Sequence, residues 1–525
     1  MNLSGGTTMS GQKYFYYAII FTSGFCLMVM ELVAVRLVAP YVGLSIYVWT
    51  SIIGIFLLGI ILGNWIGGRL ADKYPTTKAC GIFFILAALS AAAALIVLPA
   101  WQVASRTSFF IPLSILFFSF ITFFPVAFFL SLITPLVIKL SLDDIAKTGR
   151  VAGNMYSVNG VGSIVGTLAT GFLLIPFLGT KNIVLGIFLI LIVIGFFFLS
   201  KGYVQARVFS LILVITITAG FLGVWQKDIC FVESQYYCIG LDKIELNDLK
   251  RVGVGLRLDK LIHSHIYPPE VDPFGDNYTR LFGTFMGYKF NQQDSFNVLM
   301  IGGGGYVMAR HILVNYPNAT VTVLEIDPKV TQINFEKLGL APSERMITIN
   351  QDARVAISNF KEEKFDIVFA DAFNDLTVPF HLTTKEMILT VKKHMTEDGV
   401  YAMNFVDIPA GGRFFASNIA TVSSVFAQGY LFPLKKEWYN TLSRETLVIF
   451  ASDTQIDEQK WMAAAPLNDP LWSKAPETSR VELKSYISFQ DESLKNMVKE
   501  SNPIVLRDDY APVENMLAKV YRLNY

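Results

Sequence analysis

The first 226 residues contain seven apolar stretches, each close to or above the length of about 20 residues that a helix needs to cross a lipid bilayer. They lie near residues 14–38, 47–68, 79–100, 109–139, 153–178, 182–200 and 208–225. The whole chain is 53% hydrophobic and only 16% charged, whereas soluble proteins carry about 25% charged residues. We therefore predict a multi-pass α-helical membrane domain over residues 1–226, with about seven spans.

The fourth stretch, residues 109–139, is too short for two crossings and contains Pro112, Pro125 and Pro135. Proline removes a backbone donor and kinks a helix. We expect one tilted or kinked helix there.

Charge is divided unevenly between the two parts of the chain. Residues 1–226 hold 12 of the 43 Lys and Arg residues and 4 of the 42 Asp and Glu residues, so the remainder of the chain is acidic. An acidic domain disfavours nucleic acid as a partner. In the short connections between spans, nine Lys and Arg residues fall on one side and two on the other, which places the N-terminus in the cytoplasm. With seven spans, the acidic part would then lie on the extracytoplasmic face.

Two of the four cysteines, Cys230 and Cys238, bracket the start of the polar part. They could close a small disulfide in an oxidising compartment. A pair of free thiols is equally consistent with the spacing, so the sequence leaves both alternatives open.

The polar part shows two successive patterns. Residues 227–290 alternate in polarity and predict a small β subdomain, with antiparallel strands over 234–241 and 252–261. Over residues 291–525, strands alternate with helices, which predicts a Rossmann-like, methyltransferase-type doubly wound sheet. Two later strands, near 430–434 and 446–451, would add an antiparallel hairpin.

Polar or glycine residues follow four consecutive strands of this predicted sheet. Gly302–Gly305 follow the first strand and allow a ligand to approach the backbone closely. Glu325 ends the second strand and suits the two hydroxyls of a ribose. Asp352 follows the third strand and can accept from an adenine amine. Asp371, with Asp375 shortly after it, follows the fourth. The carboxyl ends of parallel strands share one edge, so these positions together predict an adenosine site.

The glycine pattern narrows the choice of nucleotide. A dinucleotide site has a third glycine at a position that is Val307 here, and no Lys-Ser or Lys-Thr pair follows the loop. The remaining ligand is an adenosine without phosphates, and the usual reactive one is S-adenosylmethionine or its decarboxylated form. Asp371 and Asp375 would lie beside its cationic sulfur. The histidines show no metal-ligand spacing with cysteine, so no metal site is predicted.

At these residues the chain resembles the spermidine synthase family of polyamine aminopropyltransferases, and specifically its membrane-fused bacterial branch. The matching segments are Glu233–Tyr236, Leu299–Gly304, Leu324–Asp327, Asp352–Ala353, Phe369–Phe373 and Leu506–Glu514. The resemblance implies a multi-pass protein of the bacterial inner membrane. Soluble relatives form dimers or tetramers, so a homo-oligomer is compatible with the resemblance, but the sequence does not give the oligomeric state.

The resemblance implies a reaction in which an amine, such as a polyamine, attacks the carbon beside the sulfonium and releases methylthioadenosine. The sulfonium is a substrate, and no cofactor is held permanently. Asp371 and Asp375 would act on the amine, and Tyr278 would line its site. Donor-binding residues implied by the matching motifs are Gly302, Gly303, Gly304, Gly305, Glu325, Ile326, Asp352, Ala353 and His263, the last in place of a glutamine of the soluble enzymes.

Two departures from the family pattern keep other functions open. Gly305 stands where soluble synthases have an aspartate that binds the ammonium of the decarboxylated donor, so intact S-adenosylmethionine becomes plausible, and Gly305→Asp should shift preference toward the decarboxylated donor. Asp375 is displaced by one residue, which leaves diamine recognition in doubt. The alternatives are an S-adenosylmethionine lyase or cyclase without an amine acceptor, a methyltransferase, and a membrane transporter that senses the nucleoside.

Overall fold

The computed structural model describes residues 6–104, 111–142, 144–199, 230–246, 251–372, 378–434, 444–472 and 486–517. The chain divides into two compact units. The first comprises Met1–Ile229 with Glu233–Gln235, and the second comprises Cys230–Val232 with Tyr236–Tyr525. Each unit is described separately below.

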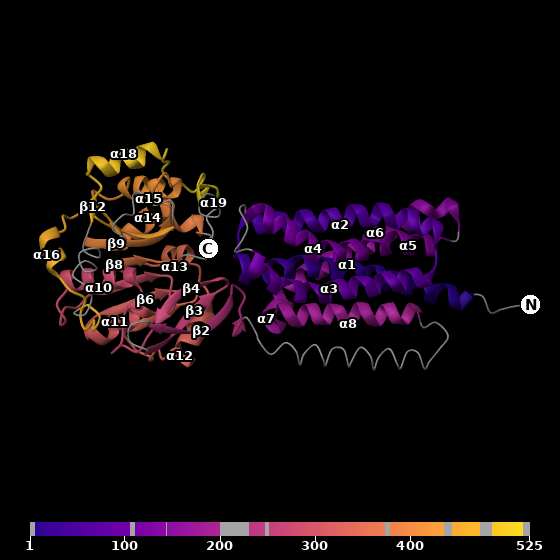
Figure 1. The fold of residues 1–525 in the computed structure, drawn as a ribbon, viewed down its shortest axis with the longest axis horizontal. Coiled ribbons are helices and arrows are strands. Elements are labelled where there is room, and N and C mark those ends of the chain that lie inside the picture. Colours follow the sequence, from indigo (N-terminus) through magenta and orange to yellow (C-terminus); the bar gives the residue numbers. More distant parts are fainter. Residues whose placement is uncertain are drawn as a thin grey trace, which may run out of the picture. The chain divides into compact units, whose positions relative to one another are not determined.

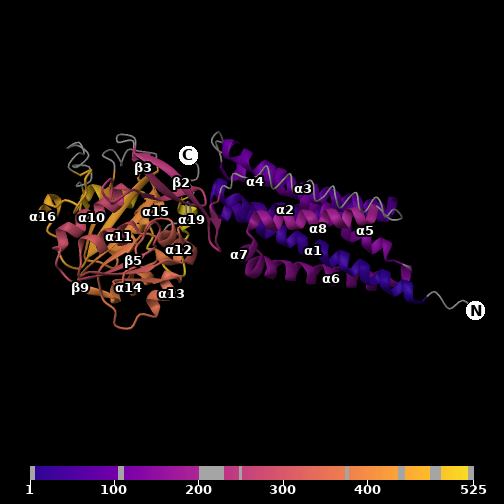
Figure 2. The ribbon, with the colours of Figure 1, turned by 90° about the horizontal axis from the view of Figure 1, so that it is seen from below.

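Up to Leu199, the described residues of the first unit form helices joined by short connections (Figures 1 and 2). Its elements are α1 (Gly6–Val42), α2 (Ile46–Lys73), α3 (Thr77–Ala104), α4 (Ile111–Ser131), α5 (Ile133–Leu140), η1 (Ile145–Lys147), α6 (Thr148–Ala169), the π-helical η2 (Thr170–Leu174), α7 (Ile175–Leu178) and α8 (Thr180–Leu199). Six helical stretches are long and apolar enough to cross a membrane. They coincide with the first six predicted spans, and the predicted seventh, 208–225, lies outside the described residues.

The predicted kink in the fourth span is confirmed. Helix α4 ends at Ser131 and α5 begins at Ile133. Pro135 explains the interruption because its ring has no N–H and clashes with the carbonyl group four residues earlier, which is that of Ser131.

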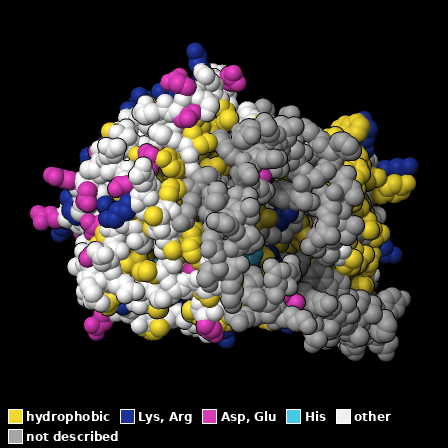
Figure 3. Space-filling model, turned by 60° about the vertical axis from the view of Figure 1, so that its left-hand side comes forward, with side chains coloured by type: hydrophobic (Ala, Val, Ile, Leu, Met, Phe, Trp, Pro, Cys, Tyr) yellow, Lys and Arg dark blue, Asp and Glu magenta, His cyan; other side chains and the backbone are white. Residues whose placement is uncertain are grey.

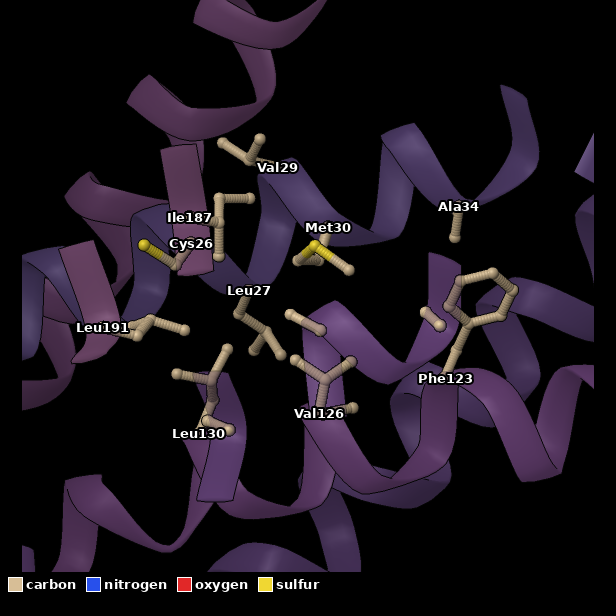
Figure 4. Close-up of a cluster of buried hydrophobic side chains, with 14 of the residues drawn as sticks. Cys26, Leu27, Val29, Met30, Ala34, Phe123, Val126, Leu130, Ile187 and Leu191 are labelled. Atoms are coloured by element: carbon tan, nitrogen blue, oxygen red, sulfur yellow. The ribbon is translucent and has the colours of Figure 1, made fainter. Parts of the chain in front are cut away.

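The apolar core of this unit lies where several helices meet. Figure 4 shows Cys26, Leu27 and Met30 of α1, Val126 and Leu130 of α4, and Ile187 and Leu191 of α8. Helices α1 and α6 approach closely at glycines: a Cβ at Gly162 would lie 2.2 Å from the carbonyl oxygen of Phe21, and one at Gly166 would lie 2.6 Å from that of Phe25. This is the small-residue packing expected between apolar helices.

The second unit begins with a small sheet in the order β1 (Val232–Glu233), β2 (Cys238–Leu246), β3 (Arg251–Leu258) and β4 (Leu261–Ile266). The predicted strand bounds 234–241 and 252–261 are therefore wrong. The corresponding strand β2 begins at Cys238 and β3 ends at Leu258. A turn at Asp259 (φ 53°) leads into β4, the strand of His263 and His265, whose bounds were not predicted. In the structure Cys230 and Cys238 are bonded, with their Cα atoms 5.2 Å apart.

The large sheet has eight strands in the order β12-β10-β11-β9-β8-β5-β6-β7. Their bounds are β5 (Asn297–Ile301), β6 (Thr320–Leu324), β7 (Met346–Ile349), β8 (Phe365–Ala370), β9 (Met395–Asp407), β10 (Gln428–Pro433), β11 (Glu445–Ser452) and β12 (Ile487–Ser488). Strands β5 to β9 are parallel, whereas β10 and β11 pair antiparallel. The predicted doubly wound sheet and its added hairpin are confirmed.

Helices pack against this sheet, with α14 and α15 on β9, α10 on β11 and α11 on β6. The helical elements are α10 (Asn277–Lys289), α11 (Val307–Asn315), α12 (Pro328–Glu336), α13 (Ala353–Ser358), η3 (Phe380–Leu382), α14 (Lys385–Lys393), α15 (Arg413–Ser423), α16 (Glu458–Ala463), α18 (Glu492–Glu500) and α19 (Val513–Met516). The central strand β5 is apolar and buried from Val298 to Ile301, as a strand covered on both faces must be. On the surface of this unit, charged side chains of both signs are interspersed (Figure 3).

Candidate active site

A cavity of about 600 Å³ lies at the carboxyl ends of the parallel strands. Its wall is formed by residues that follow β5, β6, β7 and β8, together with residues of β4, β9, β11 and α10. This is the edge where a doubly wound sheet binds its ligands.

The turn after β5 requires glycine. Gly302 has a φ of 98° and Gly304 a φ of 48°, values that residues with a Cβ rarely adopt. A Cβ at Gly302 would also lie 2.4 Å from the carbonyl oxygen of Asp371. The turn and the residue that follows β8 are therefore in direct backbone contact.

The N–H groups of this turn are already satisfied by the protein. Gly303 and Gly304 donate to Oε2 of Glu325, at 2.9 and 3.2 Å, and Gly305 donates to Oγ of Ser264 at 2.9 Å. These N–H groups are therefore not available as donors to a phosphate, and the Glu325 carboxylate occupies the position that a phosphate would take. Burial raises the pKa of Glu325, while the backbone hydrogen bonds oppose that shift.

Gly305 is absent from the cavity wall, which Gly302, Gly303 and Gly304 all line. A Cβ at Gly305 would lie 2.7 Å from Cβ of Ser264 and 2.9 Å from Cδ1 of Ile266. A side chain at this position thus meets β4 before it can reach a ligand.

Asp352, the predicted adenine acceptor, has both carboxylate oxygens engaged by the protein. Its Oδ1 caps α13 by accepting from the backbone N–H of Val355 at 3.1 Å, and its Oδ2 lies 2.9 Å from Nε2 of His381. Ala353 and His381 line the same wall. The sequence analysis did not single out His381.

Asp371 lies in the cavity wall near Asn404 and Tyr278. Its Oδ1 accepts from Nδ2 of Asn404 at 2.9 Å. Burial raises the pKa of Asp371 to about 6, whereas Asn404, the nearby Tyr278 hydroxyl and His263 act to lower it. A carboxyl group with a pKa near the working pH is suited to accept a proton from a substrate.

Asn404 is the residue of this site that the sequence analysis missed. Asn404 lies on β9 and lines the cavity, and its Oδ1 is buried and has no hydrogen-bond partner among the described residues. Buried polar atoms are normally paired. The carbonyl oxygen of Asn404 is thus an unused acceptor next to the cavity, and its own accessible surface is close to zero. The signal in the sequence was a single amide within an otherwise apolar strand.

Most of the predicted site residues line this one cavity: Tyr278, Gly302, Gly303, Gly304, Glu325, Ile326, Asp352, Ala353, Asp371 and His263. Asp375 lies outside the described residues. Within the described part of the chain, no three His, Cys, Asp or Glu side chains are grouped so that they could hold a metal ion.

Residues 284–432 match the family model of the spermine/spermidine synthase domain. The resemblance to the spermidine synthase family is confirmed. The matched residues include the glycine turn, Glu325, Asp352, Asp371 and Asn404.

Three curated relatives show how far the similarity extends. The polyamine aminopropyltransferase of Vibrio vulnificus is 29% identical over 192 residues, covering 36% of this chain and 62% of the relative. The probable polyamine aminopropyl transferase of Bifidobacterium longum is 27% identical over 222 residues, covering 42% of this chain and 48% of the relative. The match therefore spans less than two thirds of either protein. Polyamine aminopropyltransferase 2 of Aquifex aeolicus is 22% identical over 444 residues and covers 79% of this chain and 83% of its own.

Proposed function

We propose that the second unit transfers an aminopropyl-type group from a sulfonium nucleoside to an amine and releases methylthioadenosine. The donor is decarboxylated S-adenosylmethionine or S-adenosylmethionine itself. The observation that carries this proposal is the hydrogen-bonded pair of Asp371 and Asn404, whose side chains line one cavity. The match to the synthase domain supports it.

The donor end of the cavity suits an adenosine without phosphates. Backbone donors of the glycine turn are occupied by Glu325 and Ser264, so they offer nothing to a phosphate. Glu325 and Asp352 are acceptors for the ribose hydroxyls and the adenine amine. A positively charged sulfur would lie near Asp371, where a carboxylate stabilises it.

The acceptor amine must present a lone pair to the carbon beside sulfur. As the new N–C bond forms, the C–S bond breaks, its electrons neutralise the sulfonium, and the amine loses a proton. Asp371 accepts that proton, and Asn404 Oδ1 accepts a second N–H, so the two oxygens together orient the lone pair. Tyr278 stays protonated because burial raises its pKa well above the usual value.

A transfer reaction accounts for the unpaired oxygen of Asn404 better than a cleavage without acceptor, in which that atom has no assigned role. The test is to incubate the purified full chain with each sulfonium, with and without putrescine, and to identify products by mass. We expect methylthioadenosine and an alkylated amine only when amine is present. Methylthioadenosine without amine would replace this proposal by a lyase, and S-adenosylhomocysteine would replace it by methyl transfer.

We also propose that the protein spans a bilayer and that its second unit lies on the extracytoplasmic face. The uneven distribution of Lys and Arg in the short connections supports a cytoplasmic N-terminus. The second unit is then extracytoplasmic only if the predicted seventh span, 208–225, which lies outside the described residues, crosses the bilayer in addition to the six described spans. The bond between Cys230 and Cys238 supports this side, since disulfides persist in oxidising compartments. Alkaline phosphatase fused to the C-terminus should be active in intact cells. Cytoplasmic fluorescence of a C-terminal reporter, without phosphatase activity, would reverse the orientation.

A further inference from the structure

A second cavity, of about 520 Å³, lies in the second unit behind α11. Residues of β3, β4, α11 and the segment after α12 form its wall. Most of that wall is apolar, with Val254, Ile266, Val314 and Leu338 among its residues. None of the predicted site residues lines it, so it is separate from the candidate active site.

Arg310 brings a positive charge into this apolar wall. Its guanidinium donates to the carbonyl oxygens of Gly305 (3.2 Å) and Leu338 (2.8 Å) and to Oδ1 of Asn334 (3.1 Å). All three acceptors are neutral, and no carboxylate of the described residues forms an ion pair with it. A guanidinium has five N–H groups, so two remain for a ligand. A partly buried charge is normally paired, and here the partner is missing.

The other charged side chains of the cavity wall do not neutralise the positive charge of Arg310. Asp272 is the one acidic residue among those that line the cavity, and both of its carboxylate oxygens already accept from Arg280 at 2.9 Å. Lys337 is exposed on the same wall and makes no ion pair with any described residue. The cavity is therefore positively charged as well as apolar.

His311 contributes a neutral ring to the wall. Its side chain lines the cavity in a residue that is only 3% exposed. Nδ1 accepts from Nδ2 of Asn315 at 3.1 Å. Burial lowers the pKa of His311 to about 3, so the ring is neutral and its proton lies on Nε2. That Nε2–H is buried and has no partner among the residues described.

We propose that this cavity binds a small amphiphilic anion, a carboxylate or phosphate joined to an apolar body. Arg310 and Lys337 take the anionic group, and the apolar body lies against Val254, Ile266 and Val314. The site is independent of the proposed transfer reaction. Its wall is nevertheless linked to the glycine turn of the candidate active site, because Arg310 also donates a hydrogen bond to the carbonyl oxygen of Gly305.

Binding is tested by calorimetry on the purified full chain in detergent, with three probes. Phenylbutyrate carries both the anion and the apolar body, phenylbutanol carries the apolar body alone, and inorganic phosphate carries the anion alone. We expect saturable binding of phenylbutyrate that is about tenfold or more tighter than binding of either other probe, because phenylbutanol lacks the charge that pairs with Arg310 and phosphate lacks the apolar body. Equal binding of phenylbutanol would contradict the proposal, and so would equal binding of phosphate.

Lys337→Glu is the decisive variant because this exposed side chain holds nothing in the fold. It should weaken phenylbutyrate binding about tenfold. Lys361→Glu makes the same charge change at an exposed position outside the cavity wall and should leave the affinity unchanged. Val314 is 73% exposed, so Val314→Trp should narrow the cavity without unfolding the protein and should also weaken binding. The proposal fails if the two Glu variants bind phenylbutyrate alike.

Discussion

The side-chain nitrogen of Asn404 lies 2.9 Å from Oδ1 of Asp371, and this contact fixes the direction of the Asn404 amide. An ionised carboxylate only accepts hydrogen bonds, so the amide must turn its NH₂ group toward Asp371. Its carbonyl oxygen is then directed elsewhere and is left unpaired in the cavity wall. Asp371, the proposed base, thus follows β8, and Asn404 lies beside it on the neighbouring strand β9.

Asn404→Leu should change both the rate and its pH dependence. In the native protein kcat/KM should fall about tenfold per pH unit below pH 6, because Asp371, with its pKa raised to about 6, accepts no proton once protonated. The hydrogen bond from Asn404 lowers that pKa. Its loss should move the acid limb to higher pH by about one unit. A pH profile of kcat/KM measures this shift, and an unmoved limb would refute the role given to Asn404.

Asp371→Asn should abolish transfer while methylthioadenosine still binds. The substitution keeps the size of the side chain but removes the proton acceptor, which typically contributes about 10²–10⁴ in rate. Calorimetric binding of methylthioadenosine serves as the control for folding. Turnover within threefold of the native rate would exclude Asp371 as the base.

Gly305→Ala should weaken methylthioadenosine binding and lower the melting temperature. Its Cβ would lie 2.7 Å from Cβ of Ser264, so β4 or the glycine turn must shift. The structure therefore revises the expectation that Gly305→Asp would act as a donor switch, since the added side chain meets β4 first. A Gly305→Asp variant of native stability with an altered donor preference would restore the earlier expectation.

Arg280→Met should destabilise the second unit strongly. Arg280 lies on α10, the helix that also carries Tyr278. It forms buried ion pairs with Asp272 and Asp469. Its removal leaves two buried carboxylates without a partner, at a cost of about 3–5 kcal/mol. Thermal unfolding of the full chain measures the loss. Lys495→Met, which removes an exposed ion pair with Glu492, is the control, and equal melting temperatures for the two variants would contradict the prediction.

Gly162→Leu should disrupt the first unit, whereas Gly160→Leu should be tolerated. A Cβ at Gly162 would lie 2.2 Å from a carbonyl oxygen of α1, while one at Gly160 meets no atom within 4 Å. The yield of monodisperse protein in detergent distinguishes the two variants. Equal yields would show that α1 and α6 do not depend on this contact.

The sequence predicted the site residues that follow the parallel strands, because the ends of strands can be located from the local alternation of apolar strands with helices. Apolar strands alternating with helices place Gly302, Glu325, Asp352 and Asp371 at one edge, whatever the details of packing. The same argument could not reach Asn404, because its contact with Asp371 depends on the pairing of β8 with β9.

Contacts between distant segments account for what the sequence analysis missed. The pairing of His381 with Asp352 joins residues 29 positions apart. The packing of Gly305 against Ser264 depends on how β4 lies against the glycine turn, which local patterns do not reveal. Helix α10 was missed as well, because it contains Gly283 and Gly287 and follows a loop rich in proline and glycine. The spacing of Cys230 and Cys238 allowed a bond without requiring one.

The most direct test of the account is an experimental structure of the full chain with methylthioadenosine and an acceptor amine. The account predicts the nucleoside between Glu325 and Asp352, with the amine nitrogen within hydrogen-bond distance of both Asp371 and Oδ1 of Asn404. A nucleoside bound elsewhere, or an amine that contacts neither oxygen, would contradict it.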